Sequence, residues 1–362
     1  MMALLSLYVI EKVMFMPESV WIVGAGFSRH AGGPLMYDLF SESADVFLES
    51  PDEHSLKAMK HVGSIFRKYL AKNHNGQTYW QNAEDFLEKL DSLTARKTQH
   101  FVLTQLMQDM YEAGVQSADE LRRIAFCRMC KEVQDYITQT PPCSERLIPY
   151  MHWVKHLHES DTVITFNYDT LIETVAKYAS VSMEVPLPTD RINENRLNLI
   201  KLHGSVSWSL NSSKIPEVRE SFNETFLDLP AVHKNPCSPL IATPGASKGR
   251  FMSDFAEQWH YAREAIKSAL AIHIVGYRFP ESDSAAALNL LLPMRESRSG
   301  CTVHIVLGTD VLKPETVRLE TLVDRNLLGD PKSVIVHPMY AQDYLLLDNE
   351  WKEHRKIPYA LF

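Results

Sequence analysis

The stretch VWIVGAGFS, residues 20–28, decides how the fold begins. Four apolar residues, most of them β-branched or aromatic, run directly into Gly24-Ala25-Gly26, which is typical of a buried strand that ends in a tight turn. Glycine lets the backbone take a positive φ and lets another group approach closely. The sequence therefore predicts a strand over 20–24, followed by a helix whose first N–H groups face a phosphate.

The glycine turn alone is weak support for a bound nucleotide. The dinucleotide fingerprint G-x-G-x-x-G needs a third glycine at position 29, where this chain has Arg29. A strand-to-helix turn that holds no ligand therefore stays open. Ser28 has two interpretations as well, as a helix cap or as a hydrogen-bond donor to a phosphate oxygen.

Strand-like and helix-like segments alternate along the rest of the chain. The predicted strands lie within 161–169, 197–205, 271–283, 301–310 and 332–340, and the clearest helical patterns are at 82–93, 101–114, 170–179 and 255–270. This alternation predicts an α/β fold with a Rossmann-like parallel sheet and helices on both faces. The pattern is mostly helical over 35–158, so a large helical insertion follows the first strand. Residues 209–240 show no clear period and are predicted as loop with short elements.

The two chain ends are predicted to stand apart from the main domain, which covers 17–345. Residues 1–16 are apolar but are interrupted by two charges and lack a basic start and a cleavage site. They fit neither a signal peptide nor a membrane span. Two interpretations stay open: translation starts at a later methionine, or this arm packs against another subunit. Residues 346–362 are predicted as a C-terminal tail.

Composition narrows the function classes. The 362 residues carry a formal net charge of −8, which does not favour nucleic acid or an anionic membrane surface, so direct binding to either is not expected. Five cysteines are present, and their odd number and wide spacing argue for a reducing, cytoplasmic compartment. Structural zinc needs four ligands, and Cys127 and Cys130 form the one close pair, so no metal is expected.

Polar side chains and glycines follow the predicted strands. They are Asn167 and Asp169 after the second strand, His203 and Gly204 after the third, and Gly276 after the fourth with Asp283 shortly beyond it. The carboxyl ends of parallel strands meet at one edge of a sheet, and ligands of open α/β sheets bind there. We therefore expect these groups to share one site with the glycine turn.

The order of the motifs resembles that of sirtuin-like proteins. The motifs are G-A-G-F-S, A-G-G-P (31–34), N-A-E-D-F-L (82–87), T-F-N-Y-D (165–169), L-H-G-S (202–205) and I-V-G-Y-R-F-P-E-S-D (274–283). More narrowly, the set looks like the bacterial sirtuin-like NAD hydrolases of antiphage defence. The deacylase branch carries a zinc ribbon of two C-x-x-C pairs after the His-Gly motif, and this sequence lacks it.

The resemblance implies that NAD is the substrate. Asn167 would hold the ribose hydroxyls or the attacking water, His203 would act as general base, and Asp169 would hold the nicotinamide carboxamide. The diphosphate would be bound by Gly24, Ala25, Gly26 and Ser28. The adenosine side would be formed by Gly276, Tyr277, Asp283, Gly308 and Thr309.

Several of these residues also have a plain structural interpretation. Asn167 and Asp169 would both suit the cap of the helix that starts near 170. A buried strand end such as that before His203 also suits a core histidine. Trp208 is predicted to lie in the core. His152 and His156 are four residues apart but lack an H-E-x-x-H pattern, so a solvated helix face is expected.

The stretch at 82–87 has no firm chemical role. We expect a helix start here, with Asn82 as the cap. Glu84 and Asp85 then place their charges in the first turn, where they complement the helix dipole.

Three functions remain open at the level of sequence. The leading one is an NAD hydrolase that depletes the cell of NAD during phage infection, with a linear or cyclic ADP-ribose product. The second is a nucleotide-binding scaffold subunit without turnover, and the third is an NAD-dependent deacylase or ADP-ribosyltransferase. The long helical insertion suggests protein contacts, and we expect a homo-oligomer. The resemblance implies a sensor on a separate chain, such as a HerA-type ATPase or a short Argonaute.

Overall fold

The structure is a computed structural model that describes most of the chain. The described residues are 19–48, 53–70, 80–95, 108–109, 111–112, 115, 117–210, 213, 215–218, 239–242, 253–297, 300–327 and 334–347. The predicted arm at 1–16 lies outside them, as do most of the predicted helix at 101–114 and all of the predicted tail except Leu346 and Leu347.

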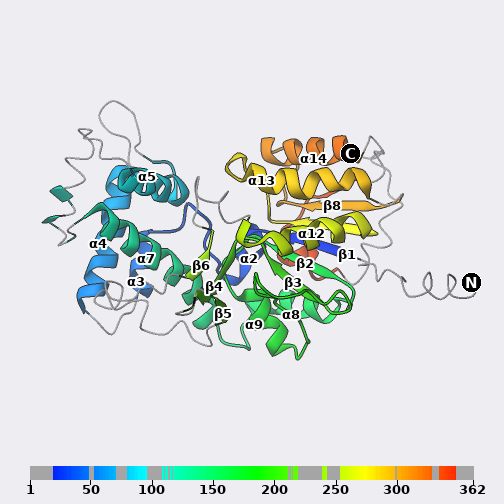
Figure 1. The fold of residues 1–362 in the computed structure, drawn as a ribbon, viewed down its shortest axis with the longest axis horizontal. Coiled ribbons are helices and arrows are strands. Elements are labelled where there is room, and N and C mark those ends of the chain that lie inside the picture. Colours follow the sequence, from blue (N-terminus) through cyan, green and yellow to red (C-terminus); the bar gives the residue numbers. More distant parts are fainter. Residues whose placement is uncertain are drawn as a thin grey trace, which may run out of the picture.

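The centre of the molecule is a six-stranded sheet in the order β3-β2-β1-β7-β8-β9 (Figure 1). The strands are β1 (Ser19–Val23), β2 (Thr162–Thr165), β3 (Asn198–Lys201), β7 (Ala271–Val275), β8 (Thr302–Val306) and β9 (Val334–His337). All neighbours are parallel, and Ile22 pairs with Ile164 on one side and with Ile274 on the other. The predicted Rossmann-like sheet is confirmed. Because the strand order reverses between β1 and β7, ligands of such sheets bind at the carboxyl ends of these two strands.

Helices cover both faces of the sheet, because the side chains of each strand alternate between them. Val20 and Ile22 join one core, and Trp21 and Val23 join the other. The first face is covered by α12 (Ala256–Ser268), α13 (Ser284–Ala286), η5 (Ala287–Leu291), η6 (Leu292–Glu296) and α14 (Pro314–Asn326). The second is covered by α8 (Ile148–Lys155), α9 (Leu171–Tyr178) and α15 (Ala341–Tyr344). Figure 1 shows α12, α13 and α14 grouped around β8, and α8 and α9 side by side near β3.

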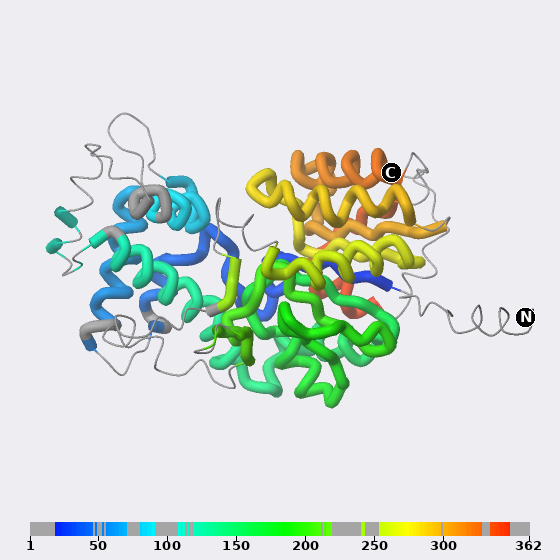
Figure 2. Tube along the Cα trace, in the orientation of Figure 1, coloured from blue at the N-terminus to red at the C-terminus, as the bar shows by residue number. Residues whose placement is uncertain are grey.

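The predicted helical insertion after the first strand is present. It contains α3 (Glu42–Phe47), α4 (Glu53–Leu70), α5 (Ala83–Ala95) and α7 (Ala118–Thr138). These helices pack around one core, which Tyr168, Val206 and Ile241 from outside the insertion also join. In it the rings of Phe66, Trp80 and Phe86 contact one another. Figure 2 shows the chain leaving the sheet after β1, forming this unit, and returning through α7.

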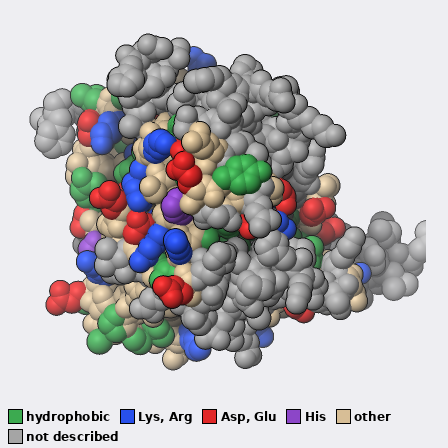
Figure 3. All heavy atoms as spheres, turned by 90° about the vertical axis from the view of Figure 1, so that its left-hand side faces the viewer, with side chains coloured by type: hydrophobic (Ala, Val, Ile, Leu, Met, Phe, Trp, Pro, Cys, Tyr) green, Lys and Arg blue, Asp and Glu red, His purple; other side chains and the backbone are tan. Residues whose placement is uncertain are grey.

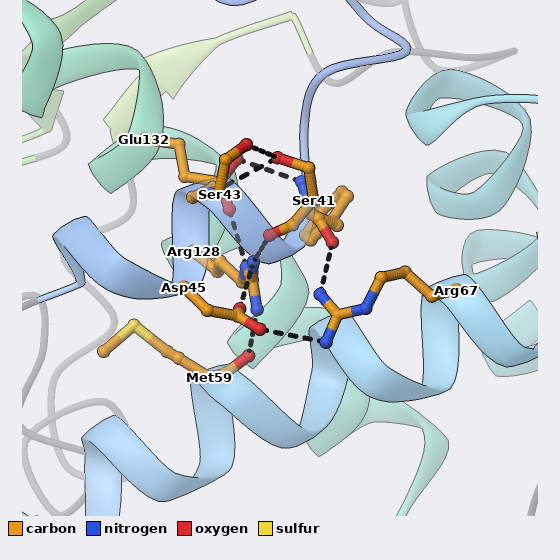
Figure 4. Close-up of polar contacts among 9 residues, drawn as sticks. Ser41, Ser43, Asp45, Met59, Arg67, Arg128 and Glu132 are labelled. Atoms are coloured by element: carbon orange, nitrogen blue, oxygen red, sulfur yellow. Dashed lines mark hydrogen bonds and ion pairs between the residues drawn. The ribbon is translucent and has the colours of Figure 1, made fainter.

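Arg128 holds the insertion together from inside its core (Figure 4). Its buried guanidinium bonds Glu132 Oε1 at 2.6 Å, lies 2.7 Å from Asp45 Oδ1, and donates to the Met59 carbonyl at 2.7 Å. Glu132 also accepts the N–H of Phe40 at 3.0 Å, and Phe40 has a positive φ of 62°. The network therefore fixes the strained bend through which the chain enters the insertion.

The strand predicted over 197–205 is in fact two strands in two sheets. β3 ends at Lys201, and β4 (Gly204–Leu210) begins a three-stranded antiparallel sheet with β5 (Pro216–Val218) and β6 (Pro239–Ile241). Gly204 has φ +78°, and a Cβ there would lie 2.0 Å from the Leu240 carbonyl oxygen. His203 therefore lies in the sharp turn between the two sheets.

The surface at the insertion end carries both signs of charge. Figure 3 shows basic and acidic side chains interspersed among the described residues of that face. Among the described helices, none is long and apolar enough to cross a membrane.

Candidate functional site

The glycine turn after β1 packs directly against the glycine turn after β7. Gly24 N–H donates to the Val275 carbonyl at 3.2 Å, and Gly26 N–H donates to the Gly276 carbonyl at 3.0 Å. Gly276 has φ +66°, and a Cβ there would lie 2.2 Å from the backbone nitrogen of Phe27. The glycines are therefore required by the close approach of two backbones within the protein.

The helix predicted after the turn is short. It consists of α2 (Ala25–Ser28), which passes into the 3-10 turn η1 (Arg29–Ala31). A single turn has a small dipole, and two of the N–H groups at its start already donate to the β7 turn. Phosphate binding by Gly24, Ala25 and Gly26 stays a prediction, and it requires this turn to exchange hydrogen-bond partners.

Asn167 joins the end of β2 to the glycine turn. Its Nδ2 donates to the Gly24 carbonyl at 3.0 Å and to Ser28 Oγ at 3.3 Å. Its own N–H is held by Thr165 Oγ1 at 3.0 Å, and the residue is 9% exposed. The Asn167 side chain thus faces the predicted site and does not cap α9.

Asp169, two residues further along, lies just before Thr170, the N-cap residue of α9. Its Oδ1 accepts the N–H of Leu171 at 3.1 Å, at the start of α9. Its main-chain carbonyl accepts from the buried Lys201 Nζ at 2.5 Å, and Lys201 also pairs with Glu173 at 2.8 Å. Nothing in the sequence singled out Lys201, because one lysine at the end of an apolar strand carries no motif.

Tyr136 reaches the site from the last part of α7. Burial, followed by the neighbouring Asp169 carboxylate, raises the pKa of Tyr136 well above its ordinary value, and Ser28 is also among its neighbours. Its phenol therefore stays protonated at neutral pH. No motif in the sequence pointed to Tyr136, because it comes from a helix of the insertion.

His203, Asp283 and Tyr277 form a contiguous polar group. His203 Nε2 lies 3.3 Å from Asp283 Oδ2, and Tyr277 Oη donates to the same Oδ2 at 2.5 Å. All three residues are buried, with exposed fractions of 7% or less. Burial, and then the Asp283 carboxylate, raises the pKa of Tyr277 well above its ordinary value, so the phenol remains a donor.

Phe166 packs against both His203 and Tyr277. Its ring stacks on Tyr277 with centroids 3.9 Å apart and an angle of 5°, and it meets the edge of His203 at 4.9 Å. It lies one residue before Asn167 in T-F-N-Y-D. Phe166 was not among the predicted site residues, although an aromatic residue inside that motif was a usable signal.

The insertion also contributes a carboxylate. Burial raises the pKa of Tyr168 and of Tyr277, and the charge of Glu84 adds a smaller increase to both. Glu84 follows the predicted helix cap, which is confirmed: Asn82 Oδ1 accepts the N–H of Asp85 at 3.0 Å. The motif at 82–87 thus places a negative charge near the candidate site.

Gly308 and Thr309 lie beside the edge of the sheet. Gly308, with φ +114°, forms an isolated bridge to Met339 after β9, and Thr309 is exposed. The contacts that join Asn167, Ser28 and the glycine turn are on the other side of β7. The adenosine-side role of Gly308 and Thr309 stays a prediction.

The remaining candidates have structural roles. Trp208 is 1% exposed and stacks near Phe255, which confirms its place in the core. The rings of His152 and His156 lie 4.4 Å apart, and His152 Nδ1 contacts the Leu345 carbonyl at 3.1 Å. Among the described residues, no three His, Cys, Asp or Glu side chains come together as metal ligands.

Taken together, the described residues build a buried polar cluster at the carboxyl edge of β1, β2, β3 and β7. It combines an amide donor, an imidazole beside a carboxylate, and protonated hydroxyl groups. Such a cluster can orient a polar substrate and accept a proton from it.

Comparison with known proteins adds little. No protein-family model matches the chain, and no curated protein sequence matches it. One similar solved structure concerns the structural basis of sirtuin substrate affinity. It is 14% identical, covers 94% of this chain and 95% of its own, and has a TM-score of 0.37. A likeness this distant transfers no function.

Proposed function

We propose that this chain hydrolyses NAD to nicotinamide and ADP-ribose, with a linear or cyclic product. The observation that carries the proposal is the placement of Asn167 and His203. Both lie at the carboxyl ends of neighbouring strands in a Rossmann-ordered sheet, and Asn167 touches the glycine turn at the strand-order reversal. The resemblance of the motifs to sirtuin-like NAD hydrolases supplies the substrate.

The chemistry needs few groups. The bond between ribose C1′ and the nicotinamide nitrogen breaks, the pair of electrons leaves with neutral nicotinamide, and a water oxygen or a ribose hydroxyl bonds to C1′. The Asn167 amide would orient that nucleophile, and His203 would accept its proton. Asp169 would hold the carboxamide, and Ser28 Oγ would donate to a phosphate oxygen.

A second candidate, a nucleotide-binding scaffold without turnover, is favoured by one observation. Asn167 Nδ2 and the N–H groups of Gly24 and Gly26 already donate within the protein. Binding NAD would require these bonds to be exchanged. The same observation fits a hydrolase that is silent until another chain activates it.

The biological setting is part of the proposal and rests on the motif resemblance. The chain would act in the cytoplasm as an effector of antiphage defence by NAD depletion. It would form a homo-oligomer and respond to a sensor on another chain, such as a HerA-type ATPase.

The test is nicotinamide release from NAD by the full chain, followed by chromatography. We expect Asn167→Ala and His203→Ala each to lower the rate by about a hundredfold or more, with normal folding by circular dichroism. The matched controls are Asn195→Ala and His156→Ala, both at exposed positions. Unchanged release by Asn167→Ala contradicts the proposal.

A silent wild-type chain calls for two further measurements: calorimetric titration with NAD, and the same assay with the product of the neighbouring gene. NAD binding without turnover in both settings supports the scaffold. Transfer of label from NAD to protein, with no free ADP-ribose, supports a transferase.

A further inference from the structure

We propose that Asp283 is a positioning residue that keeps the proton of His203 on Nε2, so that Nδ1 is the nitrogen that accepts a proton. The catalytic meaning of this inference rests on the proposed function. The arrangement itself is a property of the folded chain and can be tested without a substrate.

The first step is the contact between the two side chains. His203 Nε2 lies 3.3 Å from Asp283 Oδ2, and the two residues are 6% and 3% exposed. A carboxylate can only accept, so a neutral imidazole beside it is stabilised with its hydrogen on the facing nitrogen. Such contacts are often long in the absence of substrate and shorten in the reacting complex.

The second step is that Asp283 does not serve as a cap for the helix that follows it. It occupies the N-cap position of α13, yet its side chain makes no capping hydrogen bond. Aspartate at an N-cap commonly bonds the helix N–H groups. Here the carboxylate points to Tyr277 and His203 instead.

The third step is that the carboxylate is held in place. Tyr277 Oη donates to Asp283 Oδ2 at 2.5 Å, and the Tyr277 ring contacts both Phe166 and Gly24. A side chain on Gly24 would displace that ring, since a Cβ there would come within 2.7 Å of Tyr277 Cδ2. The glycine turn of β1 thus acts on His203 through Tyr277 and Asp283.

Tyr277 and Asp283 belong, by these contacts, to the reacting end of the site. The motif resemblance placed Tyr277 and Asp283 toward the adenosine, whereas their contacts here are with His203. Phe166, which touches both His203 and Tyr277, completes the support.

The test is nitrogen-15 NMR of the full chain labelled at histidine, at about pH 8, where an ordinary imidazole is neutral. His203→Ala assigns the signal. We expect the Nε2–H tautomer in the wild-type chain and a shift of the population toward Nδ1–H in Asp283→Asn, because the new amide can donate to Nε2. Asp119→Asn, at an exposed helix position, is the matched control and leaves the tautomer unchanged.

Kinetics give the second readout. In Asp283→Asn, kcat for nicotinamide release falls by about a hundredfold, while KM stays within about threefold, because the tautomer matters for proton transfer and not for binding. If the wild-type chain releases no nicotinamide, either alone or with the product of the neighbouring gene, the proposed function fails while the NMR result still decides the inference.

Two results overturn the inference. One is an Nδ1–H tautomer in the wild-type chain, and the other is an unchanged tautomer in a folded Asp283→Asn variant. If that variant does not fold, Tyr277→Phe replaces it, because it keeps the ring and removes the hydroxyl that fixes the carboxylate. A smaller shift in the same direction is then expected, and no shift overturns the inference.

Discussion

The ring of Tyr277 lies directly on Gly24. A Cβ on Gly24 would come within 2.7 Å of Tyr277 Cδ2 and within 2.8 Å of the Gly276 carbonyl oxygen. The space that glycine leaves after β1 is therefore filled by another part of the protein. This contact links the turn at the start of the fold to the polar group around His203.

Gly276→Ala is expected to destabilise the fold strongly. The new methyl group would meet the backbone of Phe27 at 2.2 Å, and φ is +66°. Left-handed strain costs about 1–2 kcal/mol and forced overpacking about 1–3 kcal/mol, so the free energy of unfolding should fall by about 3 kcal/mol. Urea denaturation followed by circular dichroism measures it.

Gly300→Ala is the control for that experiment. Gly300 has φ +88°, but among the described residues no atom lies within 4 Å of the place that the alanine methyl would take. It should therefore show the strain alone, about 1–2 kcal/mol. Equal losses at positions 276 and 300 would mean that the contact between the two turns carries no weight.

The parallel sheet was predictable because its signals are local. Each strand is a short apolar run that ends in glycine or a polar residue, and alternation with helices implies parallel pairing. The error at 197–205 had a physical cause: the apolar pattern continues through Leu202 to Val206, while the positive φ of Gly204 breaks the strand. Sequence alone does not show that the chain changes sheets there.

The candidate site was predictable only as a set of strand ends. Which groups touch depends on strand order and on short turns, and neither can be read from spacing. Asp283 is eighty positions from His203, so their contact appears only in the fold. Tyr136 and Glu84 come from the insertion, whose approach to the sheet no periodicity reveals.

Glu132 should make the stability of the insertion depend on pH. Burial, opposed by Arg128, raises the pKa of Glu132 from 4.5, so the folded chain binds this proton more tightly than the unfolded chain. Its stabilising contribution is complete below the unfolded pKa and is lost as the pH rises through the folded pKa. The unfolding free energy of the wild-type chain, minus that of Glu132→Gln, should therefore fall as the pH rises above 4.5.

The control for this pH series is Glu281→Gln, at an exposed position outside the insertion. Its difference from the wild-type chain should stay flat over the same range. A Glu132→Gln difference that rises with pH would show that the pairing with Arg128 outweighs burial.

The cysteines should differ sharply in reactivity. Cys143 is exposed, whereas Cys130 and Cys301 are buried, and burial raises the pKa of Cys301 to about 11. About one Cys301 thiol in a thousand is then ionised at pH 8, and the thiolate is the reactive form. Alkylation of the folded chain, mapped by peptide mass spectrometry, should label Cys143 before Cys130 and Cys301. Equal labelling is expected in urea, and early labelling of Cys301 in the folded chain would contradict the burial.

Lys201 should be strongly coupled to Glu173. Lys201 is 1% exposed, and its Nζ lies 2.8 Å from Glu173 Oε1 beneath the Asp169 turn. Lys201→Met leaves a partly buried carboxylate without its cation, so the free energy of unfolding should fall by about 3–5 kcal/mol. Adding Glu173→Gln should recover part of that loss, which gives a coupling energy above about 1 kcal/mol in a double-mutant cycle.

The matched control is a double-mutant cycle on the more exposed ion pair Arg123–Asp119. Its charged atoms lie 3.4 Å apart. Its coupling should be about 0.3–0.5 kcal/mol, because water screens both charges. If the Lys201–Glu173 cycle gives the same small value, the lysine is held by the Asp169 carbonyl and not by the carboxylate. Lys201 would then support the Asp169 turn through a single hydrogen bond, and Glu173→Gln alone would be nearly neutral.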